Sequence, residues 1–281
     1  MIPDANLGWL FTEVDWPDRF AAAASAGFTA VEMPWPPLPP QQVADALTGH
    51  GLTSVLVNVP VGSGEFGFGW ACRPDHLATF RETFAQALAY ADLTATRFIH
   101  VLAGLCPPGL DHDLARDTYR TNLVWALDQL GPDGPTLLVE AINRRDNPHF
   151  LLADLADAAD LVASLDHPRV RLLFDTFHCG VEGLRTGQHP TRTVADRFAE
   201  VRDLVGHIQL GDAPERTAPG TGVIDFAAFF EVLCEADWSG FIGGEYRPDV
   251  DTVASLNWRG QLTAPGGDLR RSAHSATGGI T

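Results

Sequence analysis

The sequence contains no lysine, and all nineteen basic side chains among its 281 residues are arginine. Imine chemistry on a carbonyl substrate, a pyridoxal phosphate anchor and a Walker-type phosphate loop each require a lysine, so these sites are excluded. No glycine-rich loop follows the first predicted strand, so a nicotinamide cofactor is not expected. The few cysteines lack the spacing of a zinc knuckle or a disulfide framework; they are Cys72, Cys106, Cys179 and Cys234.

Positive charge is scarce relative to negative charge. Aspartate and glutamate number 36 against nineteen arginines, which gives a formal net charge of −17. Such a balance argues against nucleic acid or an anionic membrane as the main partner. No apolar stretch approaches the roughly 18–20 residues of a membrane span, and the N-terminus has no signal-peptide pattern. We therefore expect a cytoplasmic enzyme with a small-molecule substrate, and the sequence leaves open whether it forms a homo-oligomer.

Eight short apolar runs alternate with helical patterns along the chain. Phe80, Phe84, Ala87 and Ala91 are one example of the helical spacing between two such runs. Parallel strands read as continuous apolar runs because helices cover both faces of the sheet. A length of about 250 residues is typical of a (β/α)8 barrel, which we predict in preference to a doubly wound sheet. The expected strands are at 6–10, 28–32, 52–57, 97–101, 136–139, 170–174, 205–208 and 241–244.

The composition changes near the C-terminus. From about Gly260 onward the residues are mostly small or polar, with little that could enter a hydrophobic core. Segments of this kind do not bury enough apolar surface to offset the entropy of ordering them. We therefore predict a catalytic barrel over residues 1–260 and a disordered tail over residues 261–281.

Four polar residues recur at nearly constant intervals in the second half of the chain. Asp175 lies 35 residues after Glu140, Gln209 lies 34 after Asp175, and Glu245 lies 36 after Gln209. Each follows a short apolar run, and 281 residues divided by eight gives about 35 for each strand and helix. In (β/α)8 barrels, polar residues at the carboxyl ends of strands are typical of active sites. The spacing therefore predicts that these four side chains meet.

The residue types indicate proton transfer beside a divalent ion. All four side chains offer oxygen atoms, which Mg²⁺ or Mn²⁺ prefers, so all four are candidate ligands. Such an ion stabilises the enediolate that forms when an α-hydroxy carbonyl compound loses a proton. Glu140 and Glu245 lie on the outer two of the four strands, where one can remove the proton and the other can return it. The alternative is a set of unrelated loop residues in an acid-rich chain.

Three histidines and one arginine are candidate substrate-binding residues. His178 lies just beyond the sixth predicted strand, His207 on the seventh, and His100 near the end of the fourth. Arg216 lies in the loop after the seventh strand, where its guanidinium would suit a substrate carboxylate. Packing, helix capping or a surface ion pair would explain these residues nearly as well.

Several of these segments resemble the hydroxypyruvate isomerase family of xylose isomerase-like TIM barrels. The resemblance covers roughly residues 5–258. It is carried by Leu-Val-Glu-Ala-Ile-Asn at 138–143, Phe-Asp-Thr-Phe-His at 174–178, His-Ile-Gln at 207–209 with Arg216, and Gly-Glu-Tyr-Arg-Pro at 244–248.

The resemblance implies roles for the same residues. Glu140 and Glu245 become the acid–base pair, and Asp175 and Gln209 join them as candidate ligands of a divalent ion, although enzymes of this family are not uniformly described as metal-dependent. Gln209 separates the chain from related 3-epimerases, which usually have histidine there. Loops at the barrel mouth depart from the family pattern, which leaves the substrate open.

The sequence therefore predicts an isomerase that interconverts hydroxypyruvate and tartronate semialdehyde (2-hydroxy-3-oxopropanoate) through an enediolate. One alternative is an isomerase or 3-epimerase of a longer keto-sugar or a 2-oxo-tetronate. Another is a barrel that binds a sugar acid without turning it over.

Overall fold

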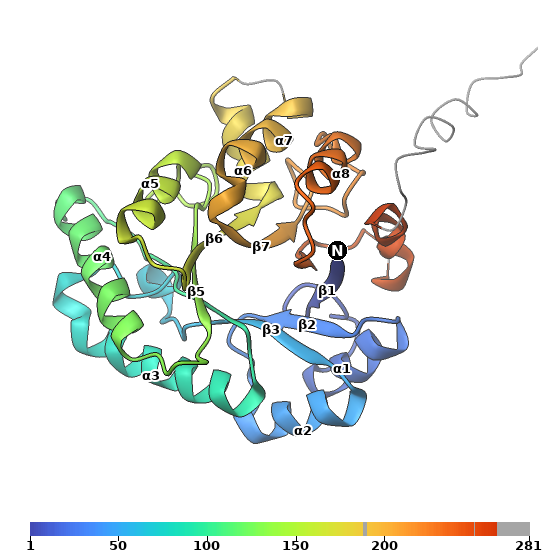
Figure 1. Cartoon of the computed structure of the whole chain (residues 1–281), viewed down its shortest axis with the longest axis horizontal. Coiled ribbons are helices and arrows are strands. Elements are labelled where there is room, and N and C mark those ends of the chain that lie inside the picture. The colour runs from blue at the N-terminus through green and yellow to red at the C-terminus, as the bar shows by residue number, and fades with distance from the viewer. Residues whose placement is uncertain (188–189, 250, 263–281) are drawn as a thin grey trace, which may run out of the picture.

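Eight parallel strands form a closed barrel in which each strand pairs with the next and β8 pairs with β1 (Figure 1). The computed structural model describes residues 1–187, 190–249 and 251–262. The (β/α)8 prediction is confirmed. The strands are β1 (Ile2–Asn6), β2 (Ala30–Met33), β3 (Thr53–Asn58), β4 (Phe98–His100), β5 (Thr136–Glu140), β6 (Val170–Asp175), β7 (Val205–Leu210) and β8 (Phe241–Gly244).

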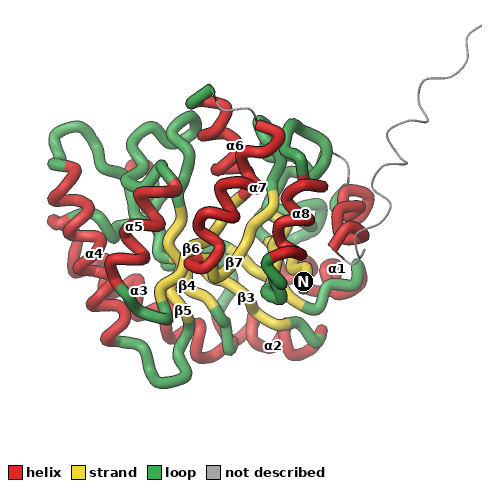
Figure 2. Tube along the Cα trace, turned by 45° about the horizontal axis from the view of Figure 1, so that its top comes forward, coloured by secondary structure: helices red, strands yellow, loops and turns green. Residues whose placement is uncertain are grey.

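Helices surround the barrel as an outer layer (Figure 2). The α-helices are α1 (Trp16–Ser25), α2 (Pro40–His50), α3 (Leu77–Thr94), α4 (His112–Asp128), α5 (Leu155–Leu165), α6 (Thr176–Arg185), α7 (Pro190–Val201) and α8 (Phe226–Glu235). Short 3-10 helices span Gly64–Phe66, Pro74–His76, Arg202–Leu204 and Val253–Leu262.

Local sequence signals set several helix ends. The α4, α5 and α8 helices begin after Asp111, Asp154 and Asp225, whose side chains accept a hydrogen bond from a backbone N–H in the first turn. The α2 helix ends at His50 because Gly51 takes a left-handed conformation with φ of 65°. These caps position the strands that follow.

The prediction for the first strand is wrong. Residues 6–10 were expected to form it, but β1 is Ile2–Asn6 and the following residues turn back on themselves. The Asn6 side chain accepts a hydrogen bond from the Gly8 N–H, and the Asn6 carbonyl accepts from Trp9 and Leu10. The true strand is hard to recognise because Pro3 and the buried Asp4 interrupt its apolar pattern.

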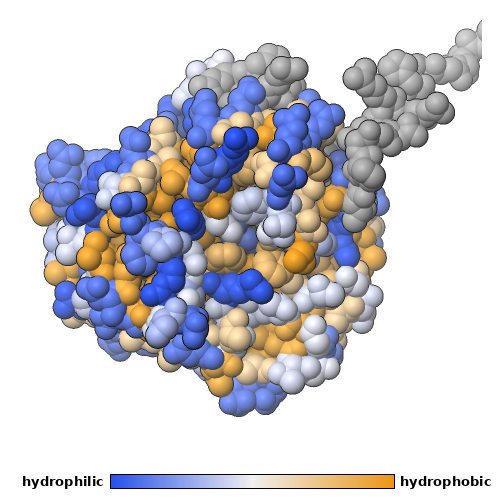
Figure 3. Space-filling view, viewed as in Figure 1, coloured by the Kyte–Doolittle hydropathy of each residue, from blue (hydrophilic) through white to orange (hydrophobic). Residues whose placement is uncertain are grey.

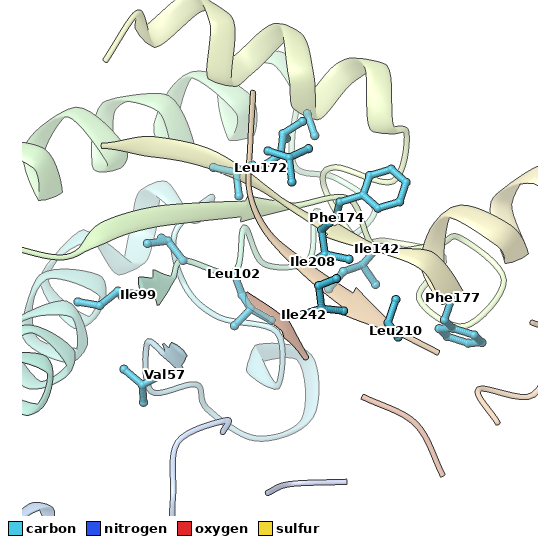
Figure 4. Close-up of a cluster of buried hydrophobic side chains, with 14 of the residues drawn as sticks. Val57, Ile99, Leu102, Ile142, Leu172, Phe174, Phe177, Ile208, Leu210 and Ile242 are labelled. Carbon is cyan, nitrogen blue, oxygen red and sulfur yellow. The ribbon is translucent and has the colours of Figure 1, made fainter. Parts of the chain in front are cut away.

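The hydrophobic core is divided by the barrel wall. The larger part lies between strands and helices, where Leu172, Phe174 and Ile208 pack (Figure 4). A smaller cluster is built from residues of the strands. It includes Leu138 and Leu173, each of which lies two positions before the last residue of its strand. Because side chains alternate along a strand, Leu138 shares its face with Glu140. Part of the layer below the polar ends of the strands is therefore apolar.

The outer surface mixes residue types. On the face shown in Figure 3, hydrophilic residues gather over the outer helices, and hydrophobic residues are visible between them. Within the described part of the chain, no helix is both long enough and apolar enough to cross a membrane. Of the tail predicted at 261–281, residues 263–281 lie outside the described part of the chain.

Candidate active site

A cavity of about 650 Å³ opens at the carboxyl ends of the strands. The regular spacing seen in the sequence places the four predicted side chains here. Glu140 ends β5, Asp175 ends β6, Gln209 is the next-to-last residue of β7, and Glu245 directly follows β8. Glu140, Gln209 and Glu245 line the cavity. Asp175 lies behind the wall, where its side chain is fully buried.

Arg216 connects two of the four predicted side chains. Its Nη2 donates to Asp175 Oδ2 at 2.9 Å and to Glu245 Oε1 at 2.6 Å. The guanidinium lies 4.4 Å from the ring centroid of Trp9 and 4.9 Å from that of Phe177. Arg216 also has a φ of 57°, a left-handed value that is rare for a bulky residue and concentrates at functional sites. This arginine is therefore an internal part of the site.

Asp175 is fixed by backbone as well as by Arg216. It is the N-cap of α6, and its Oδ1 accepts hydrogen bonds from the N–H groups of Phe177 and His178. Burial raises the pKa of Asp175, while Arg216 and these N–H donors oppose the shift. Donors of this kind favour the ionised form of a carboxylate. Asp175 is thus placed to hold Arg216 rather than to move a proton.

The two glutamates have different surroundings. Burial raises the pKa of Glu140 well above its ordinary value, and the nearby Asp175 and Glu245 carboxyls add to this shift. Burial also raises the pKa of Glu245, but Arg216 contacts this carboxylate directly and opposes the rise. Two carboxyls in unlike environments are the usual basis for separate acid and base roles. Glu140 is suited to carry a proton and Glu245 to accept one.

His178 presents a hydrogen-bond donor to the cavity. Its Nδ1 accepts from the backbone N–H of Asn143 at 3.3 Å and from the Asn143 side-chain amide at 2.7 Å. The amide orientation of Asn143 is fixed because its Oδ1 accepts from the Asp146 N–H. Burial lowers the pKa of His178 well below its ordinary value, so the ring is neutral. The remaining proton is then on Nε2, which lies 4.0 Å from Glu140 Oε1.

His100 presents the opposite character. Its Nδ1 lies 3.2 Å from Asn58 Oδ1, an acceptor, so this nitrogen carries the ring proton. Its Nε2 is buried, has no hydrogen-bond partner in the part of the chain that the structure describes, and lies 3.6 Å from Glu140 Oε2. Burial lowers the pKa of His100 to about 3, which keeps the ring neutral. A histidine nitrogen that can accept therefore lies beside one oxygen of Glu140, and a histidine nitrogen that can donate lies beside the other.

His207 does not line the cavity, unlike the other predicted substrate-binding residues. It lies deeper in the barrel, where its Nε2 hydrogen-bonds Glu32 Oε2 and its ring stacks on Phe98. The position two residues before Gln209 on one strand explains this placement, because that residue faces the same way but one layer lower. His207 therefore contacts Glu32, below the cavity, and not the cavity itself.

Glu32 forms this support. Its Oε1 accepts from the side-chain amides of Asn6 at 2.9 Å and Gln209 at 2.7 Å, both of which line the cavity. The sequence contained a signal for Glu32, since it is the last residue of the apolar run predicted as a strand at 28–32, and the next-to-last residue of β2. Asn143 carries no such signal, because its role depends on the position of His178 in the folded chain.

Asp4 is the unsatisfied member of the layer below the cavity. Its side chain is fully buried, and no N–H or O–H group of the described residues donates to either of its carboxyl oxygens. One of its carboxyl oxygens lies within 4.8 Å of a carboxyl oxygen of Glu32 and of a ring nitrogen of His207. Burial raises the pKa of Asp4 well above its ordinary value, and the Glu32 carboxylate adds to the shift. Asp4 is therefore expected to be protonated in the folded protein.

The side chains around Arg216 are suited to a cation. The described residues include a group (Glu140, Asp175 and His178) whose potential ligand atoms lie within 4.8 Å of one another. Glu245 and Gln209 offer further oxygens in the same cavity. Asp175 and Glu245 share one guanidinium, and Glu140 adds a further negative charge when it gives up its proton, so a divalent ion would balance the excess. The donor set therefore fits a metal ion that prefers oxygen.

Comparisons with known proteins identify the family of this chain. A model of the xylose isomerase-like TIM barrel family matches residues 20–262. The chain belongs to this family. It is 35% identical over 256 residues to the 2-oxo-tetronate isomerase of Cupriavidus necator, a match that covers 90% of this chain and 95% of that protein.

Two other similar proteins also match over 90% or more of both chains. The chain is 32% identical over 258 residues to the hydroxypyruvate isomerase of Escherichia coli K12, covering 90% of this chain and 96% of that protein. The crystal structure of AP endonuclease, family 2 from Brucella melitensis superposes with a TM-score of 0.84 at 31% identity, covering 92% and 98% of the two chains. The family resemblance predicted from the sequence is confirmed.

Replacement of the buried carboxyl at Asp4 should remove a pH-dependent loss of stability. The folded state binds a proton that the unfolded chain releases near pH 3.8, so wild-type stability should fall as pH rises from there through the raised folded pKa. Asparagine cannot ionise, so Asp4→Asn should gain stability relative to wild type as pH increases. Denaturant unfolding of both proteins from about pH 4 to pH 8 measures this difference. A difference that does not change with pH would show that Asp4 is not protonated.

Proposed function

We propose that the protein interconverts hydroxypyruvate and tartronate semialdehyde (2-hydroxy-3-oxopropanoate) by proton transfer through an enediolate. The observation that carries this proposal is the pair of glutamates, Glu140 and Glu245, on one cavity with unlike electrostatic surroundings. The isomerase class predicted from the sequence is confirmed by curated relatives with the names hydroxypyruvate isomerase and 2-oxo-tetronate isomerase.

Glu245 acts as the base in this proposal and Glu140 as the acid. Glu245 removes a proton from C3 of hydroxypyruvate, and Glu140 delivers a proton to C2 of the enediolate. As the aldehyde forms, the proton of the hydroxyl oxygen on C3 passes to the oxygen on C2. His100 Nε2 is placed to accept a hydrogen bond from the first oxygen, His178 Nε2 is placed to donate one to the second, and both rings stay neutral. The reverse reaction uses the same groups in opposite roles.

A divalent ion, Mg²⁺ or Mn²⁺, would be held by oxygens of Glu140, Asp175, Gln209 and Glu245. When bound, it would polarise the substrate oxygens and stabilise negative charge on the enediolate. Glu32 accepts from the Gln209 amide nitrogen and so leaves the Gln209 carbonyl oxygen free to face the cavity. Arg216 donates to the carboxylates of Asp175 and Glu245, and so favours their ionised forms against the effect of burial.

A 2-oxo-tetronate is the second candidate substrate. The observation in its favour is the 35% identity to the Cupriavidus necator enzyme of that name. A cavity of about 650 Å³ is within the range of roughly 300–1,000 Å³ found for small-molecule sites, so a fourth carbon does not exceed its size. Comparison of kcat/KM for hydroxypyruvate and for 2-oxo-tetronate distinguishes the two substrates. A barrel that only binds a sugar acid would turn over neither.

Removal of either carboxyl should abolish most of the activity. Glu140→Gln and Glu245→Gln should each lower kcat by at least roughly 10²–10⁴-fold, the usual contribution of a general acid or base. Steady-state assays with hydroxypyruvate and thermal unfolding of the same samples measure the two effects. Glu215→Gln is a matched control, because Glu215 lines the cavity mouth but is exposed and makes no hydrogen bond to the acid–base pair. Retention of more than a tenth of wild-type kcat in either test variant would remove that residue from the mechanism.

Removal of divalent ions should also lower the activity. After exhaustive chelation, turnover should fall, and Mg²⁺ or Mn²⁺ should restore it better than a metal that prefers thiolate ligands. Elemental analysis and titration calorimetry of the chelated protein measure the ion directly. Full turnover in a sample without detectable metal would show that Arg216 alone supplies the positive charge.

A further inference from the structure

Three arginine side chains line the described part of the cavity: Arg145, Arg216 and Arg247. The substrate in the proposed function is an acid, so its carboxylate requires a positive partner. A guanidinium that is already paired with protein carboxylates would have to give up one partner to bind another. The three arginines differ in this respect.

Arg216 was the candidate from the sequence, but its guanidinium is occupied. It is bonded to the carboxylates of Asp175 and Glu245, and its Nε donates to the Glu245 backbone carbonyl at 3.3 Å. The rings of Trp9 and Phe177 lie close to this guanidinium. A substrate carboxylate at Arg216 would therefore compete with both protein carboxylates. Arg216 serves the acid–base pair instead.

Arg145 is occupied as well. Its Nε and Nη2 donate to the two carboxylate oxygens of Asp146 at 2.7 and 3.0 Å, the two-point arrangement that arginine and carboxylate prefer. Its Nη1 donates to the Pro214 carbonyl at 2.7 Å. All three kinds of guanidinium nitrogen thus have an acceptor within the protein.

Arg247 is different. Across residues 1–187, 190–249 and 251–262, no carboxylate forms an ion pair with it. Its side chain is exposed, and the guanidinium carbon lies 5.5 Å from the Trp9 ring centroid. The Arg247 backbone N–H donates to the Arg216 carbonyl at 2.7 Å, which fixes the start of this side chain beside the site. It follows the base Glu245 by two residues.

We propose that Arg247 binds the carboxylate of the substrate and so selects acids over neutral ketoses. This inference rests on the proposed function. A planar guanidinium can bind a carboxylate through two parallel hydrogen bonds. The Trp9 ring lies beside both Arg247 and Arg216, and Arg216 contacts the base Glu245. The proposed binding point is therefore close to the base. The substrate is then held at its charged end while its C2 and C3 reach Glu140 and Glu245.

The charge at the cavity mouth affects this proposal. Glu215 also lines the mouth and would repel an anion, but its electrostatic influence falls on Arg145. Because Arg247 is exposed, its attraction for the substrate should weaken as ionic strength increases. We therefore expect KM for the acid to increase with salt concentration in wild type, and this salt dependence to be absent in an Arg247 variant.

The direct experiment compares Arg247→Gln, Arg247→Lys and wild type with hydroxypyruvate. Loss of a charge-assisted bond should raise KM roughly tenfold or more in the glutamine variant and less in the lysine variant, with a much smaller change in kcat. Inhibition by dihydroxyacetone, in which a hydroxymethyl group replaces the carboxylate, should not change. Arg145→Gln is the matched control, and its KM should stay within about threefold of wild type.

A binding measurement keeps the test independent of turnover. Glycerate and glycerol differ by the same replacement and neither isomerises, so calorimetry with both reports the carboxylate contact alone. Arg247→Gln should weaken glycerate binding and leave glycerol binding unchanged. If wild type turned over neither hydroxypyruvate nor a 2-oxo-tetronate but this difference in glycerate binding were observed, the proposed function would fail and the carboxylate site would stand. If Arg247→Gln changed KM and glycerate affinity no more than Arg145→Gln, the proposal for Arg247 would be overturned.

Discussion

The guanidinium of Arg216 lies between the carboxylates of Asp175 and Glu245, and none of the three side chains is more than 13% exposed. Buried charges are costly unless each has a partner, and loss of one member of such a pair typically costs about 3–5 kcal/mol. Asp175 meets this requirement with two backbone donors and Arg216. Glu140 has no such cation in contact, so its proton is retained more easily. The distribution of one positive charge among three carboxyls thus sets the chemistry that each can perform.

A second layer of polar residues inside the barrel supports this arrangement. Glu32 holds the amides of Asn6 and Gln209 from below and is itself bonded to His207. The layer also dictates the sequence of β8, because a Cβ on Gly243 would lie 2.7 Å from Glu32 Oε1. Glycine is therefore required where the Glu32 carboxylate crosses the barrel. The wall of the cavity depends on residues that never reach it.

The sequence predicted the fold because the barrel repeats one local unit. Apolar runs of parallel strands and a constant interval of about 35 residues are one-dimensional signals, so Glu140, Asp175, Gln209 and Glu245 could be placed at the strand ends. The start of β1 could not, since Asp4 faces the barrel interior and resembles a loop residue in the sequence. Partnerships between distant residues were also hidden, so the pairing of Arg216 with Asp175 and Glu245 could not be predicted. The predicted cytoplasmic location stays a prediction, and whether the chain forms a homo-oligomer stays open.

The central claim is that the two glutamates move a proton between neighbouring carbons of a small acid. Proton NMR of hydroxypyruvate with the enzyme in deuterated buffer tests this claim most directly. The account predicts formation of tartronate semialdehyde, with deuterium at its C2 or at C3 of recovered hydroxypyruvate wherever the transferred proton exchanges with solvent. Absence of both product and exchange, while a longer ketose isomerises or epimerises under the same conditions, would contradict the account.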